Sequence, residues 1–337
     1  MIDVLVVGLG PAGASAAAAA ARRGLSVLAV DRKREAGRPV QCAELVPAMI
    51  GMDVGDLAAS VRQSIRAMAT FVEDEAPDVK ENFPGRMLDR AAFDAALVAE
   101  AVRAGARCRF GTNLRGIGRE RPQVIIGADG PRSLAGRAIG SVNHERVETR
   151  QVTVPLLAPH EATDIFLSAD IPGGYGWLFP KGGVANLGAG VAPAQRGRLK
   201  DIVARLHRSL AAEGRVGRKV LATTGGAIPV GGMLEPWAML DRTLVLLAGD
   251  AAGLTNPVTG AGIAAAVHSG RLAGEAAAAW ISGDRRAAAD YQEELESVFK
   301  PALDRAVRRR SELARAGERP GARALRRGWI AYPEYWA

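Results

Sequence analysis

The chain has 337 residues, of which 48% are hydrophobic and 24% charged. These values exclude a disordered or collagen-like chain, and the length leaves room for two domains. Forty glycines follow no period, which indicates tight backbone turns. The chain contains only two cysteines, Cys42 and Cys108, which excludes a disulfide scaffold or a cysteine zinc cluster. We assign no metal site and expect a reducing compartment.

The formal net charge of +8 is concentrated near the C-terminus. Between Lys300 and Arg327, ten basic residues stand against three acidic ones, so this segment alone carries +7. Such a run is typical of a solvated helix face, or of a surface that meets an acidic protein, anionic lipid or nucleic acid. We retain an acidic protein and a peripheral membrane contact as alternatives and expect no nucleic acid.

The first predicted unit is a β-α-β motif. Residues 4–7 form an apolar strand, 13–23 an alanine-rich helix closed by Gly24, and 26–30 a second buried strand. This order predicts a parallel sheet with a right-handed crossover. The uncharged stretch 4–21 holds three glycines and a proline and follows no basic region, so we predict neither a membrane span nor a signal peptide and expect a cytoplasmic protein.

The later elements change period along the chain. A helix is predicted over 90–103 and strands over 106–110 and 124–128, followed by short alternating strands over 151–156, 165–168 and 184–191. Then come a helix over 199–212, strands over 220–229 and 243–248, and long helices over 260–280 and 285–316. The pattern indicates a mainly parallel domain that is interrupted by an antiparallel lobe and completed by C-terminal sequence.

A glycine-rich motif joins the first strand to the first helix. Gly8-Leu9-Gly10-Pro11-Ala12-Gly13 has the spacing of a dinucleotide fingerprint, with Gly8 at the tight turn, Gly10 where the pyrophosphate approaches, and Gly13 where helix meets strand. Free N–H groups at the helix N-terminus then bind phosphate. Asp31 follows Gly8 by 23 residues and would accept the ribose hydroxyls of an adenosine. The motif by itself does not distinguish FAD from NAD.

Two later motifs resemble those of flavoproteins. Ile-Gly-Ala-Asp-Gly-Pro-Arg-Ser at 126–133 and Ala-Gly-Asp-Ala-Ala-Gly at 248–253 each follow a predicted strand, and the second leads into Asn-Pro-Val-Thr-Gly-Ala-Gly-Ile at 256–263. They are similar to the motifs of the flavoprotein monooxygenase-like class. The resemblance implies FAD, with Asp250 on the ribityl chain. It also implies that the helix after Gly260 points its N-terminus at the flavin N1 and C2 carbonyl, where negative charge collects on reduction.

Three further segments resemble the geranylgeranyl reductase family. Gly-Arg-Pro-Val-Gln-Cys-Ala-Glu at 37–44 is similar to that family's cysteine-containing flavin loop. Pro-Gly-Gly-Tyr-Gly-Trp-Leu-Phe-Pro at 172–180 matches its P-x-x-Y-x-W-x-F-P motif, and Gly-Gly-Ala-Ile-Pro at 225–229 resembles its return strand. The likeness runs from residue 1 to about 300 and implies an isoprenoid pocket beside the flavin.

The resemblance implies catalytic roles for Cys42, Tyr175, Trp177 and Phe179. The three aromatic residues lie at i, i+2 and i+4, so on a strand they share one face and form an aromatic wall. An ordinary core face is the alternative for this wall, and a buried small hydrophobe is the alternative for Cys42. We read Cys108 as structural. We assign the cofactor contacts to Gly8, Gly10, Pro11, Ala12, Gly13, Asp31, Arg32, Arg38, Gln41, Cys42, Ala43, Arg90, Asp129, Gly130, Gly249, Asp250, Pro257, Gly260, Ala261, Gly262 and Ile263.

We therefore predict an α/β protein with a Rossmann-like FAD-binding domain (residues 1–140 and 240–300), an antiparallel β-sheet substrate lobe (141–239), and a basic C-terminal helix with an aromatic tail (300–337). The expected function is an FAD-dependent oxidoreductase that takes electrons from NAD(P)H, or from a ferredoxin-type donor, and reduces an isoprenoid carbon-carbon double bond. The alternative is a flavoprotein that passes electrons to a partner protein, such as a radical iron-sulfur enzyme. Because prenyl reductases of archaea continue beyond this point, the resemblance implies a truncated or open pocket, which the aromatic tail would close unless it meets a membrane or a protein.

Overall fold

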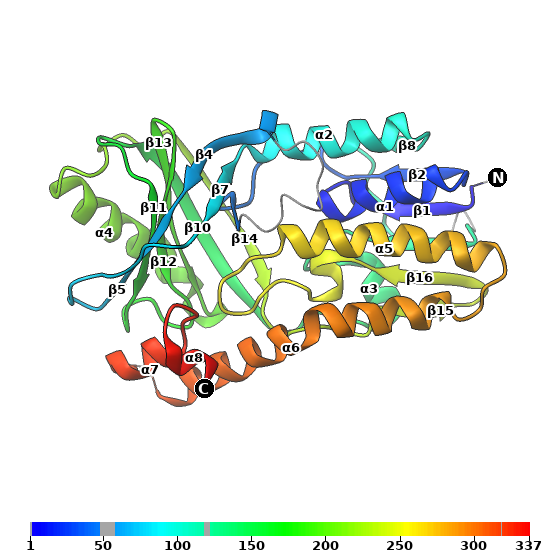
Figure 1. The fold of residues 1–337 in the computed structure, drawn as a ribbon. Coiled ribbons are helices and arrows are strands. Elements are labelled where there is room, and N and C mark those ends of the chain that lie inside the picture. The colour runs from blue at the N-terminus through cyan, green and yellow to red at the C-terminus, as the bar shows by residue number, and fades with distance from the viewer. Residues whose placement is uncertain (1, 48–57, 118–121, 318) are drawn as a thin grey trace.

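The first sheet is assembled from both ends of the chain. The computed structural model describes residues 2–47, 58–117, 122–317 and 319–337 (Figure 1). Within them, six strands lie in the order β15-β16-β9-β1-β2-β8, and every neighbouring pair is parallel except β15 with β16. Their bounds are β1 (Val4–Val7), β2 (Val27–Val30), β8 (Arg107–Arg109), β9 (Val124–Gly127), β15 (Trp237–Leu240) and β16 (Thr243–Leu247).

Helices of small residues cover this sheet. α1 (Pro11–Arg22) packs closely against α5 (Ile263–Ile281), and glycines on α5 make this approach possible. A Cβ at Gly270 would lie only 2.1 Å from the carbonyl oxygen of Ala12. At Gly274 the corresponding distance to the Ala16 carbonyl oxygen is 2.5 Å. Such contacts are available only to glycine, since any Cβ would overlap backbone atoms. α2 (Arg90–Arg103) and the short α3 (Leu134–Ala138) complete this part of the molecule.

The second sheet has seven strands in the order β14-β10-β13-β12-β11-β5-β6. All of its pairs are antiparallel except β11 with β5. α4 (Leu199–Ala212) packs on the face of this sheet that Leu178 and Leu187 occupy. The bounds are β5 (Ala67–Val72), β6 (Asp78–Lys80), β10 (Arg146–Pro155), β11 (Ala162–Leu167), β12 (Gly176–Lys181), β13 (Val184–Val191) and β14 (Ala222–Pro229).

A small third sheet and three short helical turns complete the described secondary structure. The third sheet has the order β3-β7-β4, with β3 (Leu45–Pro47), β7 (Gly85–Leu88) and β4 (Val61–Ile65). The 3-10 turns are η2 (Ala58–Ser60), η3 (Pro193–Arg198) and η4 (Gly249–Ala252). The α/β fold class, with a mainly parallel sheet, a largely antiparallel sheet and C-terminal helices, is confirmed.

The pairing differs from the sequence analysis in two places. Residues 67–80, which we assigned to the FAD-binding segment, form β5 and β6 and hydrogen-bond within the second sheet. β15 begins at Trp237, just before the expected return to the first domain at 240, and pairs with β16. Neither pairing could be predicted, because local periodicity does not tell which sheet a strand joins. The long helix predicted over 260–280 is α5, which begins at Ile263 and not at Gly260.

The C-terminal helices run back along the molecule to the second sheet. α6 (Ala287–Arg315) extends from the first domain past the junction of the two sheets, and α7 (Ala322–Arg327) and α8 (Pro333–Trp336) fold beside its end (Figure 1). The aromatic tail therefore lies close to the second sheet and does not extend away from it.

No helix among the described residues is long and apolar enough to span a bilayer.

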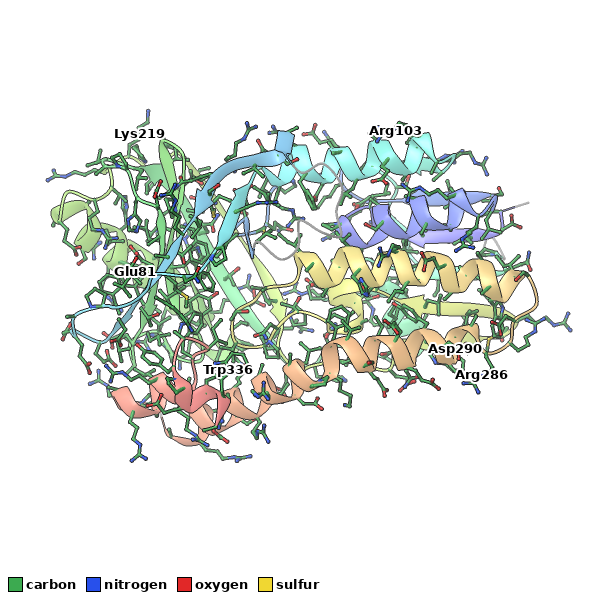
Figure 2. The ribbon with its side chains drawn as sticks, in the orientation of Figure 1. Glu81, Arg103, Lys219, Arg286, Asp290 and Trp336 are labelled. Carbon is green, nitrogen blue, oxygen red and sulfur yellow. The ribbon has the colours of Figure 1, made fainter. Side chains whose placement is uncertain are left out.

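One buried arginine fastens this tail. Arg309 is 2% exposed, and its guanidinium donates to the main-chain oxygens of Tyr335, at 2.9 Å, and of Ala337. It also pairs with Glu312 at 2.8 Å. Among the aromatic residues of the tail, Trp336 is the exposed one at 57% (Figure 2), and the Arg305 guanidinium stacks over its ring.

Half of the basic residues in the C-terminal segment form ion pairs within the described part of the chain. Lys300 pairs with Asp304, and Arg309 and Arg327 share Glu312 at 2.8 and 2.9 Å. Because Asp304 and Glu312 are already counted in the +7 of this segment, these pairs do not reduce it. Acidic residues from elsewhere in the chain do reduce it: Arg326 pairs with Glu75, and Arg319 lies 3.7 Å from Asp170. The segment is thus partly used for contacts within the chain and keeps a positive charge.

Candidate active site

Two adjoining cavities lie where the sheets meet. The larger, of about 630 Å³, is lined mainly by polar and charged side chains, and the smaller, of about 390 Å³, mainly by apolar ones. Both are lined by Gln41, Arg90, Asp250 and the β14 segment 224–227. The two cavities therefore meet along β14 and the loop that carries Cys42.

Each of the three fingerprint glycines is required for a different structural reason. Gly8 has φ +97°, and a Cβ there would lie 2.3 Å from the Ala128 carbonyl oxygen. A Cβ on Gly13 would lie 1.8 Å from the Gly8 carbonyl oxygen, so helix and turn are in direct contact. At Gly10 no protein atom lies within 4 Å of the Cβ position. Gly10 lines the apolar cavity, so its missing side chain leaves room for a ligand and not for protein packing.

The residues around this cradle fit the FAD that the sequence resemblance implies. The Asp31 carboxylate accepts from the main-chain N–H groups of Leu9 and Lys33, both at 2.8 Å, which fixes it at the end of β2. Asp250 lines both cavities, and burial raises the pKa of its carboxyl against the opposing effects of Thr255 and Arg90. A desolvated acid of this kind suits hydrogen bonding to sugar-like hydroxyls.

The loop that carries Cys42 is held from several sides. The main-chain N–H of Glu44 donates to the Cys42 sulfur at 3.2 Å, and Arg90 interacts with the same sulfur. Burial alone would lower the pKa of Arg90, but Cys42 and Asp94 outweigh burial and raise it. The Arg90 guanidinium binds both oxygens of Asp94, at 2.9 and 3.0 Å. A permanent cation thus lies beside the thiol.

Residues of the second sheet also hydrogen-bond to this loop. Glu44 is buried, and its carboxylate accepts from Lys181 at 2.6 Å and from the Asn186 amide at 3.0 Å. The Gln151 amide donates to the Cys42 carbonyl oxygen at 3.3 Å and accepts from the Trp177 indole N–H at 3.1 Å. The position of Cys42 therefore depends on both sheets at once.

The three aromatic residues form a continuous wall of the apolar cavity. The Tyr175 and Trp177 rings are 5.8 Å apart between centroids, and the Trp177 and Phe179 rings 6.2 Å. Leu178, between them in sequence, faces the opposite side of the sheet toward α4, so the predicted alternation holds. The Tyr175 hydroxyl donates to the Thr259 carbonyl oxygen at 2.5 Å. Burial and the neighbouring Cys42 raise the pKa of Tyr175, which keeps the phenol neutral.

The tail closes one side of this cavity. Trp329 is 3% exposed and its ring lies 4.8 Å from that of Tyr175. Trp329 and Ile330 both line the cavity, together with Leu45, Met68 and Phe83 from the N-terminal half of the chain. C-terminal residues therefore form part of the wall of the pocket that the sequence analysis expected to be truncated or open.

Most of the predicted contact residues lie on the two cavities. Arg32, Gln41, Arg90, Asp129 and Asp250 line the polar one, and Gly10, Pro11, Ala12, Gln41, Cys42, Ala43, Arg90, Gly130, Asp250, Gly260, Ala261, Gly262 and Ile263 line the apolar one. The carboxylate of Asp129 also accepts from Ser133 and from the Leu134 N–H at the start of α3.

The other predicted residues lie off the cavity surfaces. Gly8, Gly13 and Asp31 shape the cradle from behind, and Gly249, with φ +60°, forms the turn before Asp250. Pro257 is buried within the loop before α5. Arg38 is exposed, lies 3.8 Å from Glu35, and lines neither cavity, so the structure does not bring it to the predicted site. Cys108 is half-buried on the edge strand β8, apart from both cavities.

Several residues on or behind the cavities escaped the sequence analysis. Glu44 stands in the quoted loop motif, but nothing in that motif reveals that Lys181 and Asn186 bind its carboxylate. A buried amide in an otherwise apolar strand was the available signal for Asn186. Others include Lys33, Thr149, Arg150, Gln151, Thr163, Arg196, Lys200, Thr223, Thr224, Trp329 and Ile330.

Comparison with known proteins identifies the class. Residues 3–139 match the FAD-dependent oxidoreductase model, and residues 147–228 match the geranylgeranyl reductase catalytic domain. A solved geranylgeranyl bacteriochlorophyll reductase-like structure from Thermoplasma acidophilum is similar, with a TM-score of 0.84 and 26% identity over 96% of this chain and 89% of that one. The fold and the cofactor cradle thus define an FAD-dependent oxidoreductase.

Sequence relatives define the family. The chain is 33% identical to a digeranylgeranylglycerophospholipid reductase of Methanosarcina acetivorans, over 88% of this chain and 79% of the relative. It is also 33% identical to digeranylgeranylglycerophospholipid reductase 2 of Methanococcoides burtonii, over 90% of this chain and 81% of the relative. The chain belongs to the geranylgeranyl reductase family.

Proposed function

We propose that the protein reduces carbon-carbon double bonds of an isoprenoid lipid, with electrons that reach FAD from a nicotinamide dinucleotide. The observation that carries this proposal is the apolar cavity, whose aromatic wall of Tyr175, Trp177 and Phe179 adjoins the flavin cradle and Cys42. An apolar pocket with few polar groups suits an isoprenoid chain. The named reductase relatives support the same substrate class.

The cofactor contacts follow from the cavity lining. We assign the pyrophosphate to the α1 N-terminus at Gly10 to Ala12, where unpaired N–H groups and the helix dipole favour anions. Asp31 would accept from the adenosine ribose, and Asp250 would bind the ribityl chain. The start of α5 at Gly262 lines the apolar cavity and would stabilise negative charge on the flavin. FAD, when bound, supplies the two-electron chemistry that no side chain here provides.

Cys42 is the group that we assign to proton transfer. Reduction of a double bond needs a hydride on one carbon and a proton on the other, and the Cys42 thiol lines the cavity in which the chain would lie. Arg90 lines the same cavity, so its guanidinium is placed to face the sulfur after proton transfer. Trp329 and the aromatic wall give this cavity a mainly apolar lining, which favours a held group such as the Cys42 thiol as the proton donor.

The electron-relay alternative receives no comparable support. It requires an acidic protein to dock on the basic C-terminal segment, where five of the ten cations already form ion pairs within the chain. The apolar cavity would then have no ligand. We do not pursue this alternative further.

The function is tested by anaerobic turnover in two stages. Holoprotein is first reduced with NADPH, NADH or dithionite, and a geranylgeranyl lipid is then added while the flavin absorbance is followed. Reoxidation with loss of a lipid double bond, detected as a gain of two mass units per bond, is the expected result. A flavin that stays reduced in the presence of the lipid would exclude the proposed substrate class.

The aromatic wall gives a second test. Trp177→Ala should raise the KM for a geranylgeranyl lipid at least tenfold, because it removes the central ring of the wall and frees Gln151 from its indole partner. Phe166→Ala is the control, since Phe166 packs on the opposite face of the same sheet, near α4. Equal KM values in the two variants would show that the wall is an ordinary core face.

A further inference from the structure

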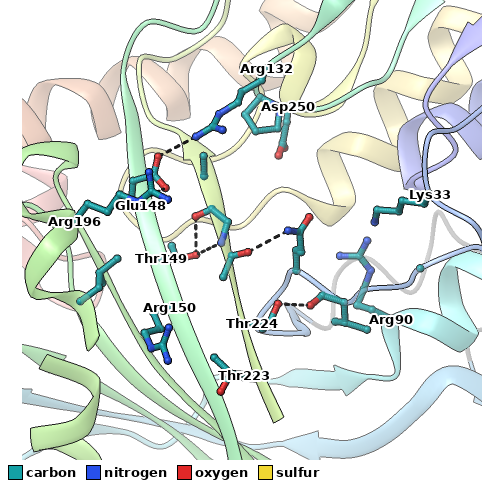
Figure 3. A pocket seen from close by; sticks show the side chains of 18 of the residues that line it. Lys33, Arg90, Arg132, Glu148, Thr149, Arg150, Arg196, Thr223, Thr224 and Asp250 are labelled. Carbon is teal, nitrogen blue, oxygen red and sulfur yellow. Dashed lines mark hydrogen bonds and ion pairs between the residues drawn. The ribbon is translucent and has the colours of Figure 1, made fainter. Parts of the chain in front are cut away.

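The polar cavity has a side that the FAD fingerprint does not explain. Arg32, Lys33 and Asp129 lie on the first-domain side, where the adenosine end of FAD is expected. The opposite side is formed by the second sheet and by the start of α4, including Arg150, Arg196, Lys200 and Thr223. Figure 3 shows Arg150 and Arg196 across the cavity from Lys33 and Arg90. We call Arg150, Arg196, Lys200 and Thr223 the cationic side.

The charges of the cavity do not cancel. Its lining holds seven Arg or Lys residues and four Asp or Glu residues. Arg90 pairs with Asp94, while Arg132 and Arg196 share Glu148 at 3.2 and 4.0 Å. The other four cations have no ion pair within the described part of the chain: Arg32, Lys33, Arg150 and Lys200. Cations that remain unpaired around one cavity create a positive potential that attracts anionic ligands.

The cavity also leads to the flavin position. Gln41, Thr149 and Thr224 line both cavities, and hydrogen bonds hold them in place along β14. Gln41 donates to the Gly225 carbonyl oxygen at 3.2 Å, and Thr224 donates to the Val40 carbonyl oxygen at 2.6 Å (Figure 3). A ligand anchored on the cationic side therefore has a polar path to the place where the apolar cavity begins.

We propose that the cationic side binds the phosphate groups of NADPH, and that Arg150 and Lys200 are its principal cations. This inference rests on the proposed function, because it assigns the donor to one cavity and the lipid to the other. Guanidinium and ammonium groups are the usual partners of phosphate, and the 2′-phosphate of NADPH adds charge that NADH lacks. The dihydronicotinamide then lies near Gln41 and β14, and passes a hydride, with both electrons, to oxidised flavin. The nicotinamide leaves as NADP⁺.

Binding of NADP⁺ to the holoprotein, measured by isothermal titration calorimetry, tests the assignment without turnover. Arg150→Gln with Lys200→Gln should raise the Kd at least tenfold, since each lost contact is a charge-assisted hydrogen bond. Lys200→Gln alone changes only an exposed side chain and should raise the Kd about threefold or more, so the test does not depend on the folding of the Arg150 variant. Arg208→Gln, exposed on α4 and lining neither cavity, is the matched control.

The outcomes separate this inference from the proposed function. If wild-type holoprotein binds no NADP⁺, or the double variant binds it as tightly as wild type, the assignment is wrong, and lipid reduction by dithionite-reduced protein still tests the function. If the variants instead raise the KM for a phosphorylated geranylgeranyl acceptor while NADP⁺ binding is unchanged, the cationic side binds the acceptor's phosphate, and the donor assignment falls. Normal NADP⁺ binding without any lipid reduction would support the donor site and contradict the proposed function.

Discussion

Replacing Cys42 with alanine is expected to abolish double-bond reduction while leaving FAD bound. The Cβ remains, so the loop keeps its contacts through the Cys42 carbonyl oxygen and the Glu44 carboxylate, but the proton donor is lost. General acid catalysis contributes about 10²- to 10⁴-fold in rate, and we expect a loss in that range. The measurement is single-turnover reoxidation of the reduced holoprotein by a geranylgeranyl lipid.

Cys108→Ala is the matched control for this change. Cys108 lies on the edge strand β8 and lines neither cavity, so its loss should leave the rate of reoxidation within about twofold. The absorbance spectrum and the flavin content should be normal in both variants. Equal rates of reoxidation in the two variants would show that Cys42 takes no part in catalysis and that its role is structural.

Replacing Arg309 with alanine is expected to release the aromatic tail. Arg309 donates to two main-chain oxygens of the tail and pairs with Glu312, and removing one partner of a buried charged network costs about 3 kcal/mol. Hydrogen exchange over residues 322–337 should show a decrease of this size in the free energy of local opening. Because Trp329 lines the apolar cavity, the KM for the lipid should rise as well.

Arg308→Ala provides the comparison for the tail. Arg308 is the exposed neighbour of Arg309 on α6, so its loss should leave both the exchange protection and the KM unchanged. A tail that remains protected after Arg309→Ala would mean that the packing of Trp329, Tyr332 and Tyr335 suffices to hold it. The tail would then be an independent part of the core rather than a fastened wall.

The charge run at the C-terminus shows why sequence patterns mislead at a surface. The sequence analysis kept a cationic docking face as one alternative for this run, yet Arg309 is buried, Arg326 pairs with the distant Glu75, and Arg327 pairs with Glu312 of the same segment. A net charge sums over a segment, whereas a docking surface depends on which side chains stay unpaired in space. The four unpaired cations of the polar cavity come from three separate segments, one with Arg32 and Lys33, one with Arg150 and one with Lys200.

The sequence by itself determined the elements that obey local rules. The fingerprint at 8–13, the strands β1 and β9, the helix α2 and the alternating aromatic wall all follow from glycine spacing or hydrophobic period. The aromatic motif also indicated the family. These features depend on neighbours within a few residues, so their signals are complete in the chain itself.

Only the tertiary structure decided how distant segments share a site. The Lys181 and Asn186 contacts to Glu44, the Gln151 link between Trp177 and Cys42, and the Trp329 closure each join residues separated by tens to hundreds of positions. The entry of β5 and β6 into the second sheet has the same origin. Such contacts arise from packing and hydrogen-bond satisfaction in the folded chain, which no local period records.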